Sequence, residues 1–299
     1  MKLIVTANKL NKRTAIPSKL PESTGVSGTV NKGFSFEGTE VLPVPNPALG
    51  KWYKDRDGAF YWGGGLIVET VNTVINLPGI PINLPATFRL GVDVSHHNSN
   101  PDWDGFKEAS ASFVFIKTSE GVGTRDKMAK ENADNARARG MRIGYYHFCR
   151  PDKKNGGTAI SDATAEAMEA LDIIVDLQKP DLPLVLDLEE FGPGKDSPLG
   201  KDDYLTWVST FVKTVKEQRG NDCIIYSRKN YLEDKLPADH DLGKITKLWL
   251  AFYPDKPDCN KVGVPRGWTD WSIWQYTEKG AIGKNPQLDI NILKDNTLF

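Results

Sequence analysis

The chain has little of what several common protein classes need. Its three cysteines, Cys149, Cys223 and Cys259, are far apart and include no CxxC pair. An odd number of scattered cysteines indicates neither a disulfide framework nor a zinc site. The four histidines form no HExxH or similar metal spacing, and we expect no metal and no cofactor. No apolar run reaches the roughly 18 residues of a membrane span.

An excess of charge is also absent. The 38 Lys and Arg and 39 Asp and Glu leave a net charge of −1, which argues against nucleic acid as a partner and gives no electrostatic reason for membrane binding. No GxGxxG or GxxxxGK follows a strand-like run, so the usual signs of nucleotide binding are missing. The start, MKLIVTANKLNKR, has an apolar stretch too short to predict a signal peptide. With 299 residues, 39% hydrophobic and 26% charged, the chain has room for one large globular domain or two.

The first 70 residues differ from the rest of the chain. They are rich in Gly, Pro, Ser and Thr, and turn residues repeatedly break their strand-sized apolar runs, which is typical of a small all-β barrel or sandwich. Residues 71–87 carry three prolines and no helical period, so we expect an extended linker there. We therefore predict an all-β domain over 1–70, the linker over 71–87 and a larger domain over 88–299.

From residue 88 onward, strands and helices alternate. Five strand–helix units are followed by three strand-like runs with little helix between them. Eight strands are enough to close a barrel, and an open doubly wound sheet is the alternative. The expected strands cover 89–95, 112–120, 141–148, 182–190, 222–227, 247–253, 271–277 and 288–293, and the expected helices cover 102–110, 126–140, 158–178, 202–220 and 230–236.

The fourth of these strands, LPLVLDLEE, ends in acids. Successive side chains of a strand point to opposite faces, so Asp187 and Glu189 are expected on one face. Two carboxylates at the end of a buried strand are costly unless they have a function. Cleavage of a glycosidic bond uses such a pair, with one carboxylic acid protonated toward the leaving oxygen and the other ionised. The alternative is that the strand ends in water with both acids solvated.

Active residues of a parallel barrel sit at the carboxyl ends of its strands, and here those ends carry acids, amides and aromatics. Asp93 ends the first strand. Asp289 is a lone acid inside the last, apolar strand, where it requires a buried partner. The other ends include Lys117, Glu120, Tyr146, His147, Trp249, Tyr253 and Gln275. Aromatic faces stack on sugar rings while acids and amides bind hydroxyls, so this set favours a carbohydrate over a phosphate ligand.

Several of these side chains have a simpler interpretation. Tryptophans such as Trp249 are more often core residues than ligand platforms. Lys117 and Glu120 are compatible with a plain ion pair. His96 and His97 more often support a loop than bind a metal.

Six segments together resemble glycoside hydrolase family 25, the lysozymes of the Chalaropsis type. They are GVDVSHHN (91–98), FVFIKTSEG (113–121), GYYHF (144–148), PLVLDLEE (183–190), LWLAFY (248–253), and WQYTEKGAIG followed by LDIN (274–291). The resemblance implies an α/β fold, a TIM-like (βα)5β3 barrel, which agrees with the strand count. It also implies a muramidase that hydrolyses the β-1,4 bond between N-acetylmuramic acid and N-acetylglucosamine in peptidoglycan, with retention of configuration.

Carried over by position, the resemblance gives the acids their roles. Glu189 becomes the general acid and later the base, and Asp187 is its ionised partner, which stabilises an oxocarbenium-like transition state. Asp93 and Asp289 match two further rim acids of the family. Nearby like charges are expected to raise one pKa of the cluster, favouring a protonated Glu189. The nucleophile, either the substrate's 2-acetamido group or a carboxylate, stays open.

The resemblance also implies sugar contacts, at Tyr146, Trp249, Tyr253 and Gln275. The chain departs from a common family pattern in one loop. GVDVS is followed by His96, His97 and Asn98, where an aromatic residue or Gln often stands.

Residues 1–68 resemble bacterial Src-homology-3-like wall-binding domains, through KLNKRTAIPS, GTVNKGFSFEGTEVL and GKWYKDRDGAFYWGGGLIVE. The resemblance implies that this part holds the enzyme on peptidoglycan glycan strands and raises its local concentration there. The alternative is a packing domain without wall affinity. Because the substrate lies outside the membrane and no signal peptide is expected, release by phage lysis or a contractile injection apparatus is the expected route to the cell wall.

Two other functions stay open at this point. A chitinase-like hydrolase of N-acetylglucosamine polymers also uses an acid-tipped fourth strand, but its longer DxxDxDxE signature is absent before Asp187. A catalytically inactive wall-binding protein is the alternative from another class, and the retained acids argue against it.

Overall fold

The chain folds into two compact units, Met1–Asn72 and Thr73–Phe299. The computed structural model describes residues 2–19, 25–45, 47–68, 73–77, 80–84, 88–192 and 194–294. Among the helices in these ranges, none has both the length and the apolar character needed to cross a membrane.

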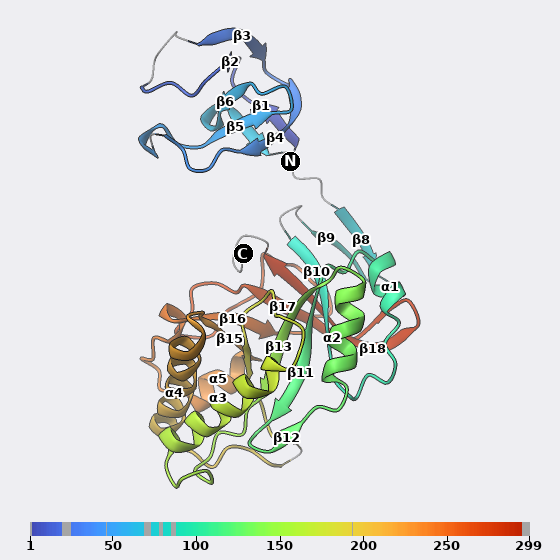
Figure 1. Ribbon diagram of the computed structural model, residues 1–299, viewed down its shortest axis with the longest axis vertical. Helices are drawn as coiled ribbons and strands as arrows, with labels where there is room; N and C mark the ends of the chain where they lie inside the picture. The colour runs from blue at the N-terminus through green and yellow to red at the C-terminus, as the bar shows by residue number, and fades with distance from the viewer. Residues whose placement is uncertain are drawn as a thin grey trace. The chain divides into compact units, whose positions relative to one another are not determined.

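The first unit is all-β, as its composition predicts (Figure 1). Its strands are β1 (Lys2–Val5), β2 (Lys9–Arg13), β3 (Val26–Asn31), β4 (Ser35–Glu40), β5 (Trp52–Asp55), β6 (Phe60–Trp62) and β7 (Leu66–Val68), with short 3-10 turns at Pro47–Leu49 and Gly63–Gly65. They pair in the order β3-β2-β6-β5-β4-β1-β7. Leu3 and Trp52 are fully buried, so the unit has an apolar core of its own.

The segment expected as an extended linker contains a hairpin. Strands β8 (Thr73–Leu77) and β9 (Ile80–Leu84) pair antiparallel, from Thr73 opposite Leu84 to Leu77 opposite Ile80. Residues 71–72, 78–79 and 85–87 of that prediction lie outside the described residues. The β-branched residues of VNTVINL favour a strand, and pairing satisfies backbone groups that a linker would leave to water. The unit boundary falls after Asn72, so the hairpin belongs to the second unit.

Eight strands of the second unit close into a ring. Strands β10 to β17, without β12, each run parallel to the next, and β18 pairs antiparallel with both β17 and β10. The bounds are β10 (Phe88–Val94), β11 (Phe113–Glu120), β13 (Arg142–Phe148), β14 (Val185–Asp187), β15 (Cys223–Arg228), β16 (Thr246–Ala251), β17 (Ile273–Ile282) and β18 (Asn285–Lys294). Because β10 pairs with β11 as well as with β18, the ring of eight strands has no free edge, and the open doubly wound sheet is excluded.

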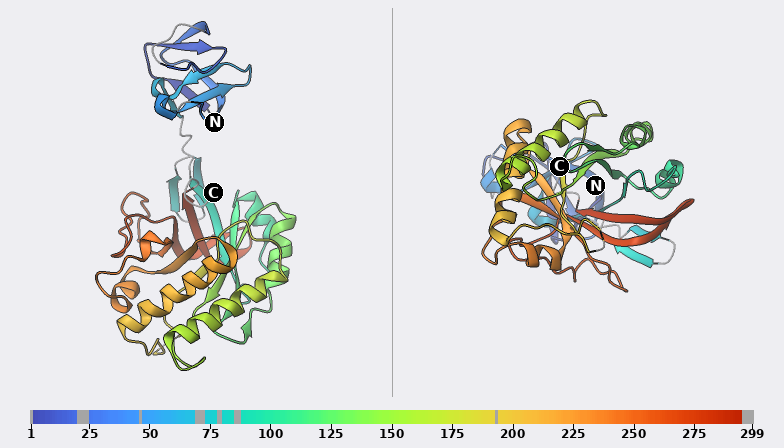
Figure 2. Two further views of the ribbon diagram at one scale, coloured as in Figure 1. Left: turned by 60° about the vertical axis from the view of Figure 1, so that its left-hand side comes forward. Right: turned by 90° about the horizontal axis from the view of Figure 1, so that it is seen from below.

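Five helices cover part of the outside of this barrel-like sheet, one after each of its first five strands (Figure 2). They are α1 (Trp103–Glu108), α2 (Ala129–Ala138), α3 (Ala159–Val175), α4 (Lys201–Arg219) and α5 (Lys229–Lys235), with a 3-10 turn at Leu242–Lys244. Each lies within or close to its predicted range. A short strand, β12 (Thr124–Arg125), pairs with the end of β11 and was not predicted.

Aromatic and branched side chains fill the inside of the ring. Strand alternation sends Phe113 and Phe115 inward, where they pack with Val185 and Trp249, while the opposite faces pack under the helices. Gly144 lies opposite Phe115 on the next strand, and a Cβ there would meet the phenyl ring at 2.2 Å. Side chains therefore fill the inside of the ring, and open space remains toward the carboxyl ends of the strands.

Candidate active site

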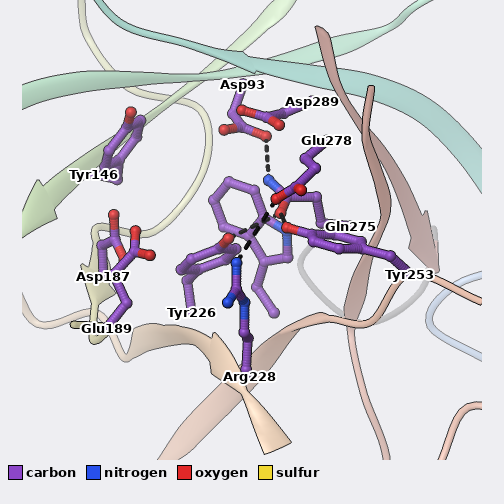
Figure 3. A pocket seen from close by; sticks show the side chains of 11 residues that line it. Asp93, Tyr146, Asp187, Glu189, Tyr226, Arg228, Tyr253, Gln275, Glu278 and Asp289 are labelled. Carbon is purple, nitrogen blue, oxygen red and sulfur yellow. Dashed lines mark hydrogen bonds and ion pairs between the residues drawn. The ribbon is translucent and has the colours of Figure 1, made fainter. Parts of the chain in front are cut away.

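A cavity of about 180 Å³ lies at the carboxyl ends of the barrel strands (Figure 3). Every site residue predicted from the sequence is in its wall. The lining residues are Asp93, Tyr146, Asp187, Glu189, Tyr226, Arg228, Trp249, Tyr253, Gln275, Glu278 and Asp289. We call this cavity the acid pocket, because five of these residues carry carboxyl groups.

Asp187 and Glu189 stand side by side at the end of β14, as strand alternation predicts (Figure 3). The sheet bonding continues past the strand: Cys149 N donates to the Asp187 carbonyl and Leu188 N donates to the Tyr226 carbonyl, both at 2.9 Å. The backbone segment that carries the two acids is therefore anchored to both neighbouring strands. Solvation of both acids, the simpler alternative, does not describe Asp187, whose exposure is 5%.

Burial and mutual repulsion set the protonation of this pair. Burial raises the pKa of Asp187 well above its usual value, and the charge of Glu189 adds to the effect. Burial also raises the pKa of Glu189, although the positive charge of Arg228 opposes the shift. Such a pair retains a proton that separated carboxyl groups would lose.

The sequence expectation has Asp187 ionised and Glu189 protonated, whereas burial raises the pKa of both groups, that of Asp187 well above its usual value. Asp187 is the more deeply buried of the two, and its Oδ1 has no hydrogen-bond partner among the described residues. A hydrogen bond joins the carboxyl groups of Asp187 and Glu189, and burial makes the ionised form of Asp187 unfavourable. Without substrate, burial therefore favours the protonated form of Asp187.

Asp93 and Asp289 form a second acidic pair across the pocket. They are direct neighbours on the antiparallel strands β10 and β18, which gives Asp289 the buried partner that its sequence context requires. Asp93 Oδ2 accepts hydrogen bonds from Gln275 Nε2 at 2.9 Å and Asn291 Nδ2 at 2.7 Å. Burial raises the pKa of Asp93 to about 6 despite these bonds. Burial and the charge of Asp93 raise that of Asp289 to about 9.

Gln275 organises the wall between these acids and the tyrosines. Its Oε1 accepts hydrogen bonds from the hydroxyls of Tyr226, at 2.8 Å, and Tyr253, while its amide nitrogen donates to Asp93. The predicted sugar contact at Gln275 thus has protein partners on both ends of its amide. Its evident role in this structure is to hold Asp93 and the two tyrosines in place.

Trp249 forms the floor of the pocket and part of the core at once. Its exposure is 2%, its Nε1 donates to Asn291 Oδ1 at 2.8 Å, and its ring lies 4.7 Å from that of Phe115. Most of the surface of Trp249 is therefore buried in the core, as the simpler interpretation expects. Only its edge toward the pocket is available to a ligand.

The cations and histidines near the pocket belong to its supports. Lys117 Nζ donates to Glu120 Oε2 at 2.7 Å, and its charge lowers the pKa values of Asp187 and Glu189 against the effect of burial. His96 Nδ1 lies 2.7 Å from Asp126 Oδ2. His96 and His97 stack with ring centroids 3.9 Å apart, and neither lines the acid pocket. Their contacts fit the interpretation that they support a loop.

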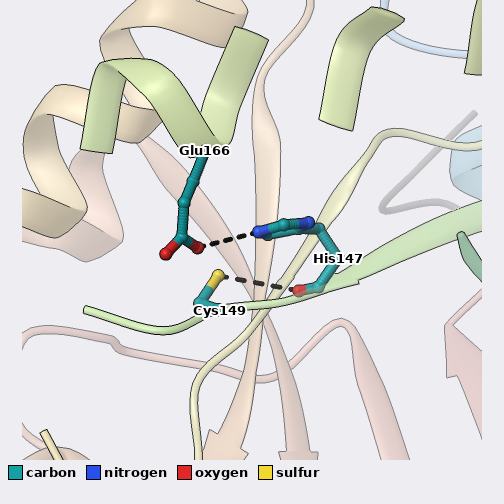
Figure 4. A group of neighbouring side chains, drawn as sticks. All are labelled: His147, Cys149 and Glu166. Carbon is teal, nitrogen blue, oxygen red and sulfur yellow. Dashed lines mark hydrogen bonds and ion pairs between the residues drawn. The ribbon is translucent and has the colours of Figure 1, made fainter. Parts of the chain in front are cut away.

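One buried cluster has the residue types of a metal site, namely His147, Cys149 and Glu166 (Figure 4). Both ring nitrogens of His147 already have partners: Nε2 lies 2.9 Å from Glu166 and Nδ1 lies 2.8 Å from Ser119. Glu166 also accepts a hydrogen bond from Arg150 N. The cluster ties α3 to the end of β13, and both ring nitrogens of His147 are engaged in these contacts.

Three lining residues were not predicted: Tyr226, Arg228 and Glu278. The first two lie at the end of β15, and inspection of that strand end by the same rule would have found them. Glu278 lies further along β17, past the point where the pairing register with β18 shifts. Strand ends alone do not indicate it.

Acids from several strand ends meeting in one pocket define the class of protein, a glycoside hydrolase. The chain belongs to Glycosyl hydrolases family 25, since the sequence model of that family matches residues 92–284. It is 29% identical to Lysozyme M1 of Streptomyces globisporus over 194 residues, 64% of this chain and 63% of that protein. The match thus spans less than two thirds of the relative's length.

Solved structures show the same fold. A bacterial lysozyme from Streptomyces coelicolor is 26% identical with a TM-score of 0.57, covering 68% of this chain and 90% of that one. A family 25 glycosyl hydrolase from Bacillus anthracis is 25% identical with a TM-score of 0.57, covering 70% and 90%. The predicted family is thus confirmed.

Proposed function

We propose that the chain is a peptidoglycan muramidase that acts on the bacterial cell wall. It would hydrolyse the β-1,4 bond between N-acetylmuramic acid and N-acetylglucosamine with retention, in a TIM-like (βα)5β3 barrel. The observation that carries the proposal is the acid pocket. In it the pKa values of Asp187 and Glu189 are both raised, and the ring of Trp249 forms the floor. The name of Lysozyme M1 supports the same reaction.

Substrate would complete the protonation pattern that catalysis needs. An acetamido N–H that donated to Asp187 Oδ1 would supply the partner this oxygen lacks and would stabilise its ionised form. The shared proton would then pass to Glu189, which faces the leaving oxygen as general acid. Asp187 in turn would orient the acetamido group for attack on the sugar carbon, which is the substrate-assisted route to retention.

Mass spectrometry of soluble products from purified peptidoglycan tests the bond that is cut. Wild type is expected to release muropeptides with reducible muramic acid ends, and Glu189→Gln serves as the matched blank. Reducible N-acetylglucosamine ends would show that the chain cuts a different bond. A digest without products would favour the binding-protein alternative.

We also propose that the first unit binds the cell wall. Its support is the compact all-β unit and the partly exposed aromatic residues Phe34 and Trp62, at 44% and 40%, which suit stacking on sugars. Sacculi should retain the full chain at least about tenfold better than residues 73–299, because a second attachment raises the local concentration. Both proteins would carry Glu189→Gln to prevent digestion. Equal sedimentation with sacculi would contradict wall binding by this unit.

A further inference from the structure

Arg228 stands where the acid pocket meets a second cavity. A groove of about 1100 Å³ borders the pocket, and the residues common to both walls are Glu189, Arg228, Tyr253 and Glu278. The acid pocket therefore opens into the groove beside the proposed general acid. A substituent on a sugar held in the pocket can pass into the groove at this point.

The guanidinium of Arg228 has donors available at this opening. Its Nη2 lies 3.7 Å from Glu278 Oε2, which is longer than a hydrogen bond, and its side chain is 60% exposed. It points toward the middle of the pocket in Figure 3 and lies 5.9 Å from the ring centroid of Tyr253. Within the ranges that the structure describes, these are its ion-pair and ring contacts.

The chemistry of the proposed substrate indicates which group the guanidinium of Arg228 binds. Muramic acid differs from N-acetylglucosamine by a 3-O-lactyl ether, whose carboxyl group is either free or joined to a peptide. A planar guanidinium matches the oxygens of such a group, whereas a neutral sugar ring has no need of a cation. Among the described residues that line the acid pocket, Arg228 is the single basic one, so it is positioned to offset the repulsion between the pocket acids and an incoming carboxylate.

We propose that Arg228 binds the lactyl carbonyl group of the muramic acid held in the acid pocket and directs the attached peptide into the groove. This inference rests on the proposed muramidase function. The groove suits a peptide, because its wall includes the half-exposed ring of Phe252 and the side chain of Tyr231. Arg228 is thereby a specificity-determining residue, selecting muramic acid over N-acetylglucosamine.

The test compares two defined oligosaccharides: a peptide-free oligomer of alternating N-acetylglucosamine and N-acetylmuramic acid, and the same oligomer with its lactyl carboxyl reduced to an alcohol. Arg228→Gln is expected to raise KM for the native oligomer about tenfold or more, as for the loss of a charge-assisted hydrogen bond. KM for the reduced oligomer should change less than about twofold. The KM of Arg228→Lys for the native oligomer should be intermediate, because lysine keeps the positive charge but lacks the paired donors of a planar guanidinium.

Arg125→Gln is a matched control. Arg125 Nη2 lies 3.7 Å from Asp172 Oδ2 and its side chain is 57% exposed, nearly the geometry of Arg228, but it lines neither cavity. It should behave as wild type. Since Arg228 also lowers the pKa of Glu189, its removal alters acid strength for both oligomers alike, and the comparison between them isolates binding.

The outcomes separate this inference from the function on which it rests. If wild type fails to cleave the native oligomer, the muramidase proposal falls and takes the inference with it. If wild type cleaves it and Arg228→Gln keeps the wild-type KM, the inference alone is overturned. Should no protein cleave the reduced oligomer, the KM of Arg228→Gln against that of Arg125→Gln on the native oligomer decides.

Discussion

Glu189→Gln is expected to lower kcat on peptidoglycan strands by about a hundred- to ten-thousand-fold, the usual contribution of a general acid. The amide has nearly the same shape as the carboxyl group but cannot give a proton to the leaving oxygen. KM should change little, because the amide still fits between Asp187 and the neighbouring wall. The measurement is initial-rate kinetics on defined glycan strands.

Two controls separate the loss of the general acid from an unspecific effect of the substitution. Glu217→Gln makes the same chemical change on α4, where the side chain is 60% exposed and lines neither cavity, and it should cost less than about threefold. The melting temperature of Glu189→Gln should not fall at neutral pH, because the charge of Glu189 is one cause of the unfavourable ionisation of Asp187. A variant that keeps wild-type kcat would remove Glu189 from the reaction.

The sequence predicts the acids well because each breaks a local pattern. Asp187 follows an apolar run, and strand alternation places Glu189 on the same face. Asp289 interrupts the apolar strand LDINIL, so its burial implies a polar environment, and it lies opposite Asp93. Such exceptions to a hydrophobic pattern are visible without a structure, because burying a carboxyl group without a function is costly.

What the sequence does not predict depends on distances between strands. The raised pKa of Asp187 follows from its burial beside Glu189, which no motif encodes. The double role of Gln275, joining Asp93 to Tyr226, requires three strands to meet. The prolines of residues 71–87 weigh against strands and favour a linker, whereas pairing of β8 with β9 tolerates a proline at an edge.

Asp289→Asn is expected to stabilise the protein at alkaline pH, and the sign follows from linkage. A free aspartate has a pKa of 3.8, and in the fold the pKa of Asp289 rises to about 9. Between these pH values the unfolded chain has lost the proton that the folded chain retains, so the free energy of unfolding falls as pH rises. Asparagine has no proton to lose, so the variant removes this term.

The melting temperature of wild type should therefore fall between pH 5 and pH 8, and that of Asp289→Asn should fall less. At pH 8 the variant should melt at least about 3 °C higher, since one pKa unit corresponds to about 1.4 kcal/mol and each kcal/mol shifts a domain of this size by about 2–4 °C. The difference should shrink toward pH 5, because that pH lies closer to the unfolded pKa of 3.8 and the free-energy penalty for keeping the proton is smaller there. Asp172→Asn, at a side chain that is 80% exposed, controls for the chemical change.

A difference in melting temperature between wild type and Asp289→Asn that stays constant across this pH range would mean that asparagine packs better. Ionisation of Asp289 would then have no part in the stabilisation. A lower melting temperature of Asp289→Asn at pH 8 would mean that the ionised carboxylate is satisfied by the fold. The expected result instead makes Asp289 a group that costs stability under the conditions in which the enzyme would work. Retaining such a group is reasonable only if its pairing with Asp93 serves the reaction, because active-site acids are commonly kept at the expense of stability.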